Sequence, residues 1–247
     1  MNVVADENTP VPGGIGNFDY FRSSSLANGN VAFFGFASTL IGNDYTSQQG
    51  IYTNIGGSLN VVADLDTPVP GGQGNFVTFD YPVLDQNGNV AFKGFESFFS
   101  QQGIYTNIGS SLNVVADTNT AIPDGTKNFQ SFGNFSFDNE NIVFLGSSAE
   151  FASEVESGIY TNISGSLEKV LAYGDSLDGK TIRGLNIGRQ ALSGNQIALL
   201  ANFTDDSSGI YVATTTSETP VPEPSSVLGV LAMGALGAGW RLRRKQQ

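Results

Sequence analysis

The chain has 247 residues, with 11 Lys and Arg against 23 Asp and Glu, and it contains neither His nor Cys. This length suffices for one large domain or two small ones. The absence of His and Cys excludes Ser/His/Asp and Cys/His catalytic triads, Cys/His zinc sites, haem bound through His, and disulfide bonds. Any catalysis has to rest on carboxylates, Tyr, Ser, Lys or a hard cation such as calcium, and we expect no cofactor.

The charge is divided unevenly along the chain. Four of the basic residues lie in the last seven positions, so residues 1–220 hold 7 basic and 22 acidic side chains, a net charge of −15. Such an acidic surface repels phosphate backbones. We therefore expect no nucleic-acid partner.

A sequence repeat with a period of about 53 residues organises residues 1–213. The string NVVAD occurs at residues 2, 60 and 113, and KVLAYGD at residue 169 is a diverged fourth copy. TPVPGG, NGNVAF and GIYT follow in a constant order, which predicts tandem copies of one supersecondary unit. The four GIY triplets begin at Gly50, Gly103, Gly158 and Gly209.

The second repeat illustrates the strands that we predict for each copy. Residues 76–84 and 89–95 are rich in aromatic and β-branched residues and flank the turn sequence DQNG, which is typical of a hairpin. Residues 103–107 and 112–116 predict two further strands. Four antiparallel strands per repeat of about 50 residues are typical of a β-propeller blade, so residues 1–213 predict an all-β, propeller-like domain of about four blades.

The two ends of the repeat region suggest how the blades could close into a ring. The chain starts on a copy of the fourth strand, Asn2–Asp6, and no such strand follows the last GIY triplet. Pairing of the N-terminal strand into the last blade would close a four-bladed ring and hide two sheet edges. The alternatives are an open array or a piece of a longer repeat protein, and a β-sandwich of repeated hairpins.

One Asp opens the loop after each fourth strand. In a closed ring these carboxylates could converge and bind a hard cation such as calcium. The competing interpretation, which we favour, is that each Asp caps its own turn, because no DxDxDG calcium loop occurs in the sequence. The four residues are Asp6, Asp64, Asp117 and Asp175.

A glycan-cleaving enzyme would need two carboxylates about 5 to 10 Å apart. Asp80, Asp85, Glu96, Asp124 and Asp138 are available, but none is marked by a recurring context. We therefore predict no catalytic residues and no enzymatic activity, with a carboxylate-based glycan-active enzyme as the alternative.

Six aromatic residues recur at equivalent positions of the first three repeats. Side chains that recur in this way usually pack between blades, and stacking of some Tyr rings on sugars is the alternative. The six residues are Phe33, Phe92, Phe144, Tyr52, Tyr105 and Tyr160.

The NGNVAF strings resemble a known repeat type. Leu26–Phe33 reads LANGNVAF and Asp85–Phe92 reads DQNGNVAF, and both keep GxxAF without the leading Asn. They are similar to the tandem NxxGxxAF-repeat proteins of bacterial surfaces, in which C-terminal anchors follow the repeats. The resemblance implies a surface repeat protein and carries no assigned chemistry.

The composition changes after the repeats. Residues 214–224 form a Ser/Thr/Pro-rich linker that cannot build a packed core, and residues 225–247 combine an apolar segment with a basic tail. With Arg241 snorkelling, the apolar segment approaches the roughly 20 residues of a membrane-spanning helix. The basic flank keeps the tail cytoplasmic and the repeat domain outside. This flank comprises Arg241, Arg243, Arg244 and Lys245.

The triplet Pro222, Glu223 and Pro224, followed by an apolar segment and an Arg-rich tail, resembles the PEP-CTERM sorting signal of Gram-negative and cyanobacterial proteins. The resemblance implies processing by an exosortase-type enzyme, a transient stay in the inner membrane, and removal of the tail. An ordinary single-pass anchor is the alternative. We expect an exported, non-enzymatic protein of the cell surface or extracellular matrix, with a structural or adhesive role and exopolysaccharide as a partner; a truncated fragment of a longer repeat protein is a further alternative.

An export pathway also requires a leader. The first residues, MNVVADENTPVPGG, have neither the basic n-region nor the apolar h-region of a signal peptide. We expect that the true start lies upstream or that the leader has been lost.

Overall fold

The structure is a computed structural model that describes residues 2–96, 101–149 and 156–215. These residues belong to one compact unit, Met1–Thr215. The predicted PEP triplet and membrane helix lie outside the described residues. Within the described ranges, no helix combines the length and the apolar character that a membrane span requires.

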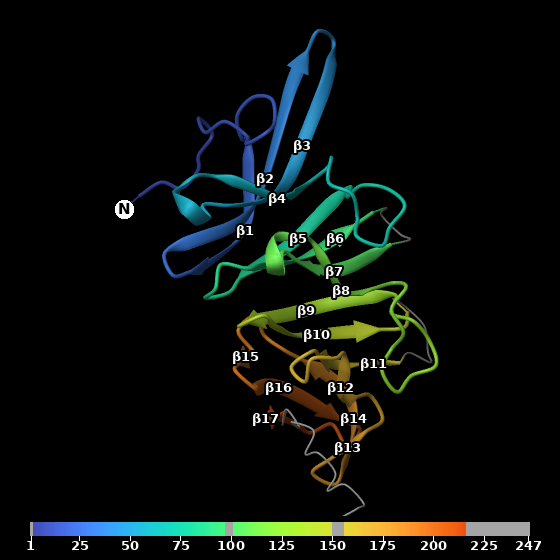
Figure 1. Cartoon of the computed structure of the whole chain (residues 1–247). Coiled ribbons are helices and arrows are strands. Elements are labelled where there is room, and N and C mark those ends of the chain that lie inside the picture. Colours follow the sequence, from blue (N-terminus) through green and yellow to red (C-terminus); the bar gives the residue numbers. More distant parts are fainter. Residues whose placement is uncertain (1, 97–100, 150–155, 216–247) are drawn as a thin grey trace, which may run out of the picture. The chain divides into compact units, whose positions relative to one another are not determined.

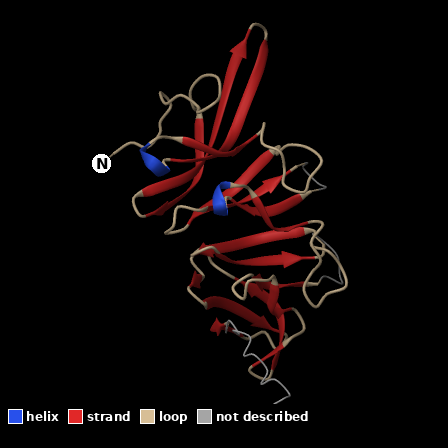
Figure 2. Ribbon diagram, in the orientation of Figure 1, coloured by secondary structure: helices blue, strands red, loops and turns tan. Residues whose placement is uncertain are grey.

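Four antiparallel β-sheets follow one another along the chain, which confirms an all-β fold (Figures 1 and 2). In each of the first three sheets, every strand pairs with its neighbours in the sequence. Antiparallel neighbours of this kind need only short hairpin connections. The first sheet comprises β1 (Tyr20–Ala27), β2 (Asn30–Ile41), β3 (Asp44–Thr53) and β4 (Asn60–Asp64).

The second and third sheets repeat this order. All four strands of the second sheet begin and end within two residues of their predicted bounds, because turn residues mark both ends of each apolar run. The second sheet comprises β5 (Thr78–Leu84), β6 (Val90–Phe95), β7 (Gln102–Thr106) and β8 (Asn113–Asp117). The third sheet comprises β9 (Ser131–Asp138), β10 (Asn141–Ser147), β11 (Ser157–Thr161) and β12 (Glu168–Ala172).

The fourth sheet departs from the pattern. It has five strands. In the other three sheets, a single first strand pairs with the second strand. Here two strands, β14 and β15, take that place and pair with successive parts of β16. The opposite edge of β16 pairs with β17 from Gln196 to Asn202. The sheet comprises β13 (Ser176–Leu177), β14 (Lys180–Asn186), β15 (Leu192–Ser193), β16 (Gln196–Phe203) and β17 (Ser208–Thr214).

The pairing that would close a ring is not formed among the described residues. Asn2–Asp6 lie outside any strand, and β17 pairs with β16 alone. The NVVAD copies that do form strands, β4 and β8, each follow a GIYT strand through one turn of 3-10 helix, Ile55–Gly57 or Ile108–Ser110. A local hairpin therefore supplies their pairing, whereas ring closure would require a contact between opposite ends of the domain.

Aromatic rings fill the space between successive sheets. In the second sheet, the rings of Phe76 and Tyr105 meet edge to face with centroids 5.0 Å apart, and Phe79 and Phe92 complete the group. This group packs in one cluster with Phe34 and other residues of the first sheet. The third sheet packs its equivalent rings on the second sheet. Packing of the recurrent aromatics between neighbouring sheets is thus confirmed at these two junctions.

Equivalent polar contacts accompany this packing. The amide nitrogen of Gln49 donates to the carbonyl of Val77 in the next sheet at 2.9 Å, and that of Gln102 donates to the carbonyl of Gln130 at 3.0 Å. The repeat therefore encodes both the fold of each sheet and its contact with the next sheet.

Candidate functional site

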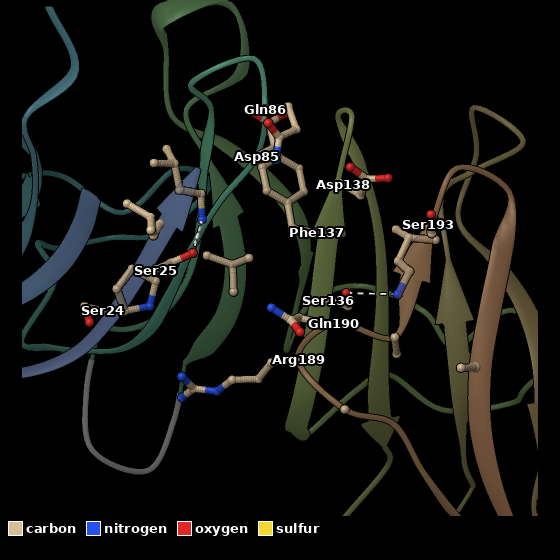
Figure 3. Close-up of a pocket in the computed structure, with 18 residues that line it drawn as sticks. Ser24, Ser25, Asp85, Gln86, Ser136, Phe137, Asp138, Arg189, Gln190 and Ser193 are labelled. Atoms are coloured by element: carbon tan, nitrogen blue, oxygen red, sulfur yellow. Dashed lines mark hydrogen bonds between the residues drawn. The ribbon is translucent and has the colours of Figure 1, made fainter. Parts of the chain in front are cut away.

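A cavity of about 930 Å³ is lined by residues from all four sheets (Figure 3). The first strands β1, β5 and β9 supply three of its walls, and the loop before β15 supplies the fourth together with β15 itself. Cavities of this size are typical of binding sites for small molecules.

Bulges in the first strands shape the cavity wall. The pairing register shifts between Arg22 and Ser24 in β1, and between Asp80 and Val83 in β5. At these bulges the backbone φ of Ser23 is 48° and that of Tyr81 is 49°, a region that non-glycine residues seldom adopt. Pro in β5 is tolerated at the bulge because no ladder hydrogen bond is required there. The bulges therefore place Ser24 and the residues after Tyr81 along the cavity.

Two equivalent serines connect neighbouring sheets at the cavity. The Ser25 hydroxyl accepts a hydrogen bond from the backbone N–H of Leu84 at 2.9 Å. The Ser136 hydroxyl accepts one from the backbone N–H of Leu192 at 3.1 Å (Figure 3). These hydroxyls bridge the first sheet to the second and the third sheet to the fourth, so they stabilise the wall.

Two of the carboxylates considered from the sequence, Asp85 and Asp138, line this cavity. Asp85 is only 3% exposed, and its Oδ1 accepts the N–H groups of Asn87 at 2.9 Å and Asn89 at 2.7 Å. Its Oδ2 accepts the Asn89 side-chain amide and the N–H of Glu140 in the next sheet. The Asp85 carboxylate is therefore committed to the fold on both oxygens.

Asp138 is less constrained, since its Oδ2 accepts one hydrogen bond, from the N–H of Gly194 at 3.0 Å. The other acids considered from the sequence do not line the cavity. Glu96 accepts hydrogen bonds from the backbone N–H groups of Gln73 and Gly74. Asp124 is exposed, and its carboxylate lies 4.0 Å from the Lys169 ammonium. Asp80 lies opposite Lys93 in the β5–β6 strand pair.

Arg189 is the basic residue that lines the cavity, and no motif in the sequence marks it as a site residue. Its guanidinium carbon lies 4.3 Å from the ring centroid of Tyr81, a cation–π contact between the fourth-sheet loop and β5. Gln190 lies beside it (Figure 3). Repeat comparison could not find Arg189, because the loop from residue 187 to 191 has no counterpart in the first three repeats.

The four calcium candidates cap their own turns. Asp64 Oδ1 accepts the N–H of Asp66 at 3.1 Å and the Thr67 hydroxyl at 2.7 Å. Asp6 and Asp117 make the same pair of contacts with the residues two and three positions later. Asp175 accepts the N–H of Ala172 at 2.8 Å. Across the described ranges, no three acidic, His or Cys residues come together as a metal site.

The recurrent tyrosines are enclosed by the packing between strands. Tyr52, Tyr105 and Tyr160 are almost completely buried, and this burial raises the pKa of Tyr52 and of Tyr160 to about 12. The pKa of Tyr105 is raised for the same reason. Their rings have no free face on which a sugar could stack, so the stacking alternative is wrong for these three residues.

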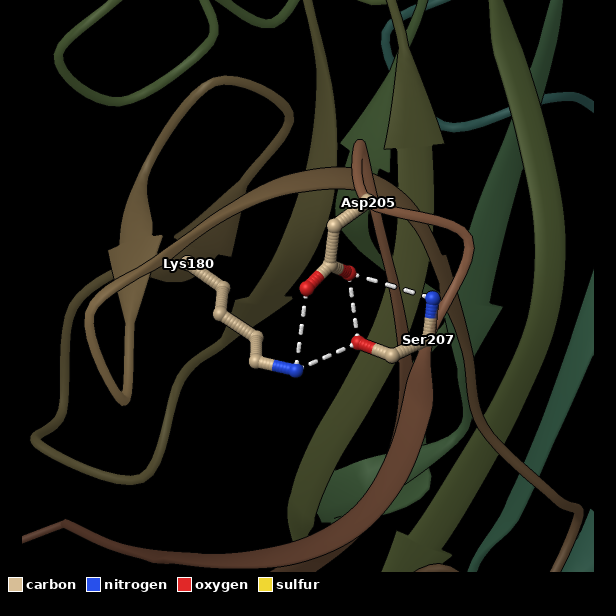
Figure 4. Close-up of polar contacts among 3 residues, drawn as sticks. All are labelled: Lys180, Asp205 and Ser207. Atoms are coloured by element: carbon tan, nitrogen blue, oxygen red, sulfur yellow. Dashed lines mark hydrogen bonds and ion pairs between the residues drawn. The ribbon is translucent and has the colours of Figure 1, made fainter.

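A second polar cluster joins Lys180, Asp205 and Ser207 (Figure 4). The Lys180 ammonium lies 3.0 Å from Asp205 and donates to the Ser207 hydroxyl at 2.6 Å. That hydroxyl donates to Asp205 Oδ1 at 2.5 Å. The hydroxyl of Ser207 and the ammonium of Lys180 hold the pKa of Asp205 at about 2. These contacts fasten the turn between β16 and β17 to Lys180 of β14.

Repeated four-stranded sheets, an acidic surface and a polar cavity between first strands define an all-β tandem-repeat protein. Residues 1–228 match the family of unknown function DUF7453, and the chain belongs to that family. Residues 220–245 match the PEP-CTERM protein-sorting motif, which includes the triplet at residues 222–224. This signal marks a secreted or cell-surface protein and implies processing by an exosortase.

No curated protein matches the chain. Among solved structures it is similar to an acylaminoacyl peptidase of Pyrococcus horikoshii, with 14% sequence identity over 86% of this chain and a TM-score of 0.46. The chain spans 33% of that peptidase. A similarity at this level carries no conclusion about activity.

Proposed function

We propose that the protein is a non-enzymatic, structural or adhesive component of the bacterial cell surface or extracellular matrix. The observation that carries the proposal is the PEP-CTERM motif at residues 220–245. An exosortase-type enzyme recognises the Pro-Glu-Pro triplet while residues 225–247 hold the protein transiently in the inner membrane. The basic tail is then removed, as in other anchors whose hydrophobic tail is discarded.

The repeated sheets support a propeller-like domain as the exported part. Each four-stranded sheet carries the same aromatic face, and the second and third sheets pack that face against the preceding sheet. Radial or linear repetition of such sheets builds a broad surface from a small unit, which suits a structural or adhesive role.

We further propose that the cavity binds a segment of exopolysaccharide. Its lining presents the hydroxyls, carboxylates and amides that hydrogen-bond to sugars, with Arg189 as its basic group. The net charge of −15 over residues 1–220 repels polyanions, so a neutral or sparsely charged polysaccharide is favoured. The cavity wall is prearranged by Asp85 and Ser136, which lowers the cost of ordering on binding.

Binding of a glycan is favoured over its cleavage because, within the described residues, only one of the two carboxylates in the cavity is free of structural hydrogen bonds on one of its oxygens. A retaining or inverting glycosidase needs two free carboxyl groups, one as acid and one as base or nucleophile. Asp85 is held on both oxygens by the fold, which leaves Asp138 as a single available carboxylate. The presence of both in one cavity nevertheless makes a carboxylate-based glycan-active enzyme the second candidate.

The test compares polysaccharide binding and turnover by the full chain and two arginine variants. Arg189→Ala should weaken binding about 10-fold or more, because it removes a charge-assisted donor from the cavity. The matched control is Arg183→Ala, which removes an exposed arginine paired with Asp206 outside the cavity. Equal loss in both variants would refute the cavity as the binding site. Release of shortened glycan that stops in Asp138→Asn would instead establish the enzyme.

A further inference from the structure

One face of the fourth sheet is exposed although the same face of the other sheets is buried. The Ile of the GIY triplet is completely buried at Ile51, Ile104 and Ile159, where the next sheet covers it. The equivalent Ile210 is 74% exposed, and Val212 on the same strand face is 62% exposed. The fourth sheet therefore carries the apolar surface of a sheet junction without a following sheet on it in the described structure.

The corresponding face of the first sheet is covered only by its own repeat in the described structure, where Phe18, Phe33 and Tyr52 are buried and Phe21 is partly buried. The aromatic group of Phe18, Phe21, Phe33 and Tyr52 clusters only with residues of the first repeat, whereas the equivalent groups of the next two sheets pack against a preceding sheet. Val31 is only partly buried, although its counterparts in the other two sheets are fully buried. The exposed face of the fourth sheet and the partly buried face of the first sheet thus correspond to the two halves of the contact that recurs between the sheets.

A strand edge is open at the same place. Within the described residues, β17 pairs with another strand, β16, along one edge only. The equivalent strands β3 and β7 also pair along their second edge, with the NVVAD strands β4 and β8. The first NVVAD copy, Asn2–Asp6, forms no strand, and Val3 is 75% exposed. An unpaired edge of this kind is a template for strand addition.

The loop after Asn2–Asp6 already has the conformation needed to cross a sheet junction. The N–H of Thr9 donates to the carbonyl of Asp6 at 2.9 Å, as Thr67 does to Asp64 at 3.1 Å in the junction between the first two sheets. An isolated bridge pairs Pro10 with Asn17, and equivalent bridges follow the other two NVVAD copies. In those repeats the loop connects a fourth strand to the first strand of the next sheet.

We propose that the protein assembles head to tail with a second copy of itself. Asn2–Asp6 of one copy pairs with the open edge of β17 in the other, and the partly buried Phe21 and Val31 of its first sheet cover Ile210 and Val212. The strand and the sheet face are linked by the same loop that joins the first sheet to the second and the second to the third. A contact between two different surfaces continues until it closes a ring or extends a chain of copies. This assembly goes beyond the proposed surface role and does not depend on glycan binding.

The register of the intermolecular pair follows from the internal ones. Ile51 pairs with Ala63 in β3–β4, and Ile104 pairs with Ala116 in β7–β8. The equivalent pair between copies is Ile210 with Ala5. Since the chain contains no Cys, single cysteines at these positions report this pair without background.

The test mixes full-length Ala5→Cys and Ile210→Cys chains in mild detergent and oxidises them. We expect a disulfide between copies at least 10-fold more abundant than in the control mixture of Ala5→Cys with Tyr45→Cys, which has a similarly exposed position on the β2–β3 hairpin. Mass spectrometry of the linked peptides identifies the pair. Equal yields in both mixtures would overturn the proposal. A chain with both Ala5→Cys and Ile210→Cys that forms only a monomeric disulfide would also overturn it in favour of closure within one chain.

Sedimentation provides a second measurement that does not rely on cysteine geometry. Ile210→Asp places a charge on the open face and should reduce the sedimenting species to the monomer, while Tyr45→Asp should leave the assembly unchanged. Both residues are exposed in the single chain, so neither substitution disturbs its core. Identical sedimentation of the wild type and Ile210→Asp would contradict the proposed interface.

Discussion

A glycine stands two residues after the Phe of each NVAF-type string, and an aromatic ring leaves no room for a side chain there. A Cβ atom on Gly94 would collide with the ring of Phe76 and lie 3.2 Å from Tyr105 Cδ2. Gly35 and Gly146 face the equivalent rings of Phe18 and Phe129. In each of these three repeats, the aromatic ring therefore packs in the space that the missing glycine side chain leaves.

Gly94→Ala should lower the free energy of unfolding by about 1–3 kcal/mol, the usual cost of overpacking a core. Urea denaturation of the full chain measures this change. The control is Gly188→Ala, because a Cβ there meets no atom within 4 Å. Equal stability of the two variants would show that the Phe76 ring can move aside freely.

The Asp205 cluster makes a prediction about pH. The pKa of Asp205 in the folded state is about 2, below the ordinary Asp value of 3.8, so the folded state favours the ionised carboxylate. The resulting stabilisation is present above pH 3.8 and is lost as the pH falls from 3.8 towards 2. In an NMR titration, we expect a carboxyl midpoint near 2 that rises in Ser207→Ala, because the hydroxyl is the main cause of the shift. A wild-type midpoint near 3.8 would contradict the hydrogen-bonded cluster.

At the scale of the elements, β9 and β15 are held together by one buried hydrogen bond from Leu192 N–H to the Ser136 hydroxyl. Ser136→Ala leaves that buried N–H without its partner, which should cost about 1–3 kcal/mol in the free energy of unfolding. Ser24→Ala, at an exposed position of β1, is the control and should cost little. Loss of stability in both or neither variant, measured by thermal unfolding, would refute this role for Ser136.

The sequence predicted the strands of the second sheet because each apolar run ends at a turn signal such as DQNG. It could not predict β13 and β15, which are two residues long and lie in the diverged fourth repeat. It also missed Arg189, because a cavity formed by four sheets depends on contacts between distant segments and leaves no periodic pattern. Asp85 and Asp138 were recognised only as two among many acids.

At the scale of the whole molecule, the ring closure that the sequence left open as one possibility is not formed among the described residues. The N-terminal NVVAD copy and the open edge of β17 are complementary in sequence, yet they remain unpaired. The repeat sequence makes the N-terminal NVVAD copy suitable for pairing with β17. Whether it pairs within one chain or with a second copy depends on the distance between the two ends of the domain. The head-to-tail assembly uses the same segments with a different partner.

The central claim is that the repeat domain is an exported protein delivered by its PEP-CTERM signal. Mass spectrometry of the protein isolated from the cell surface or matrix tests this claim most directly. Processing predicts a C-terminus close to Pro222, with the apolar segment and basic tail removed. A surface protein that retains the intact sequence from Arg241 to Gln247 would contradict the account.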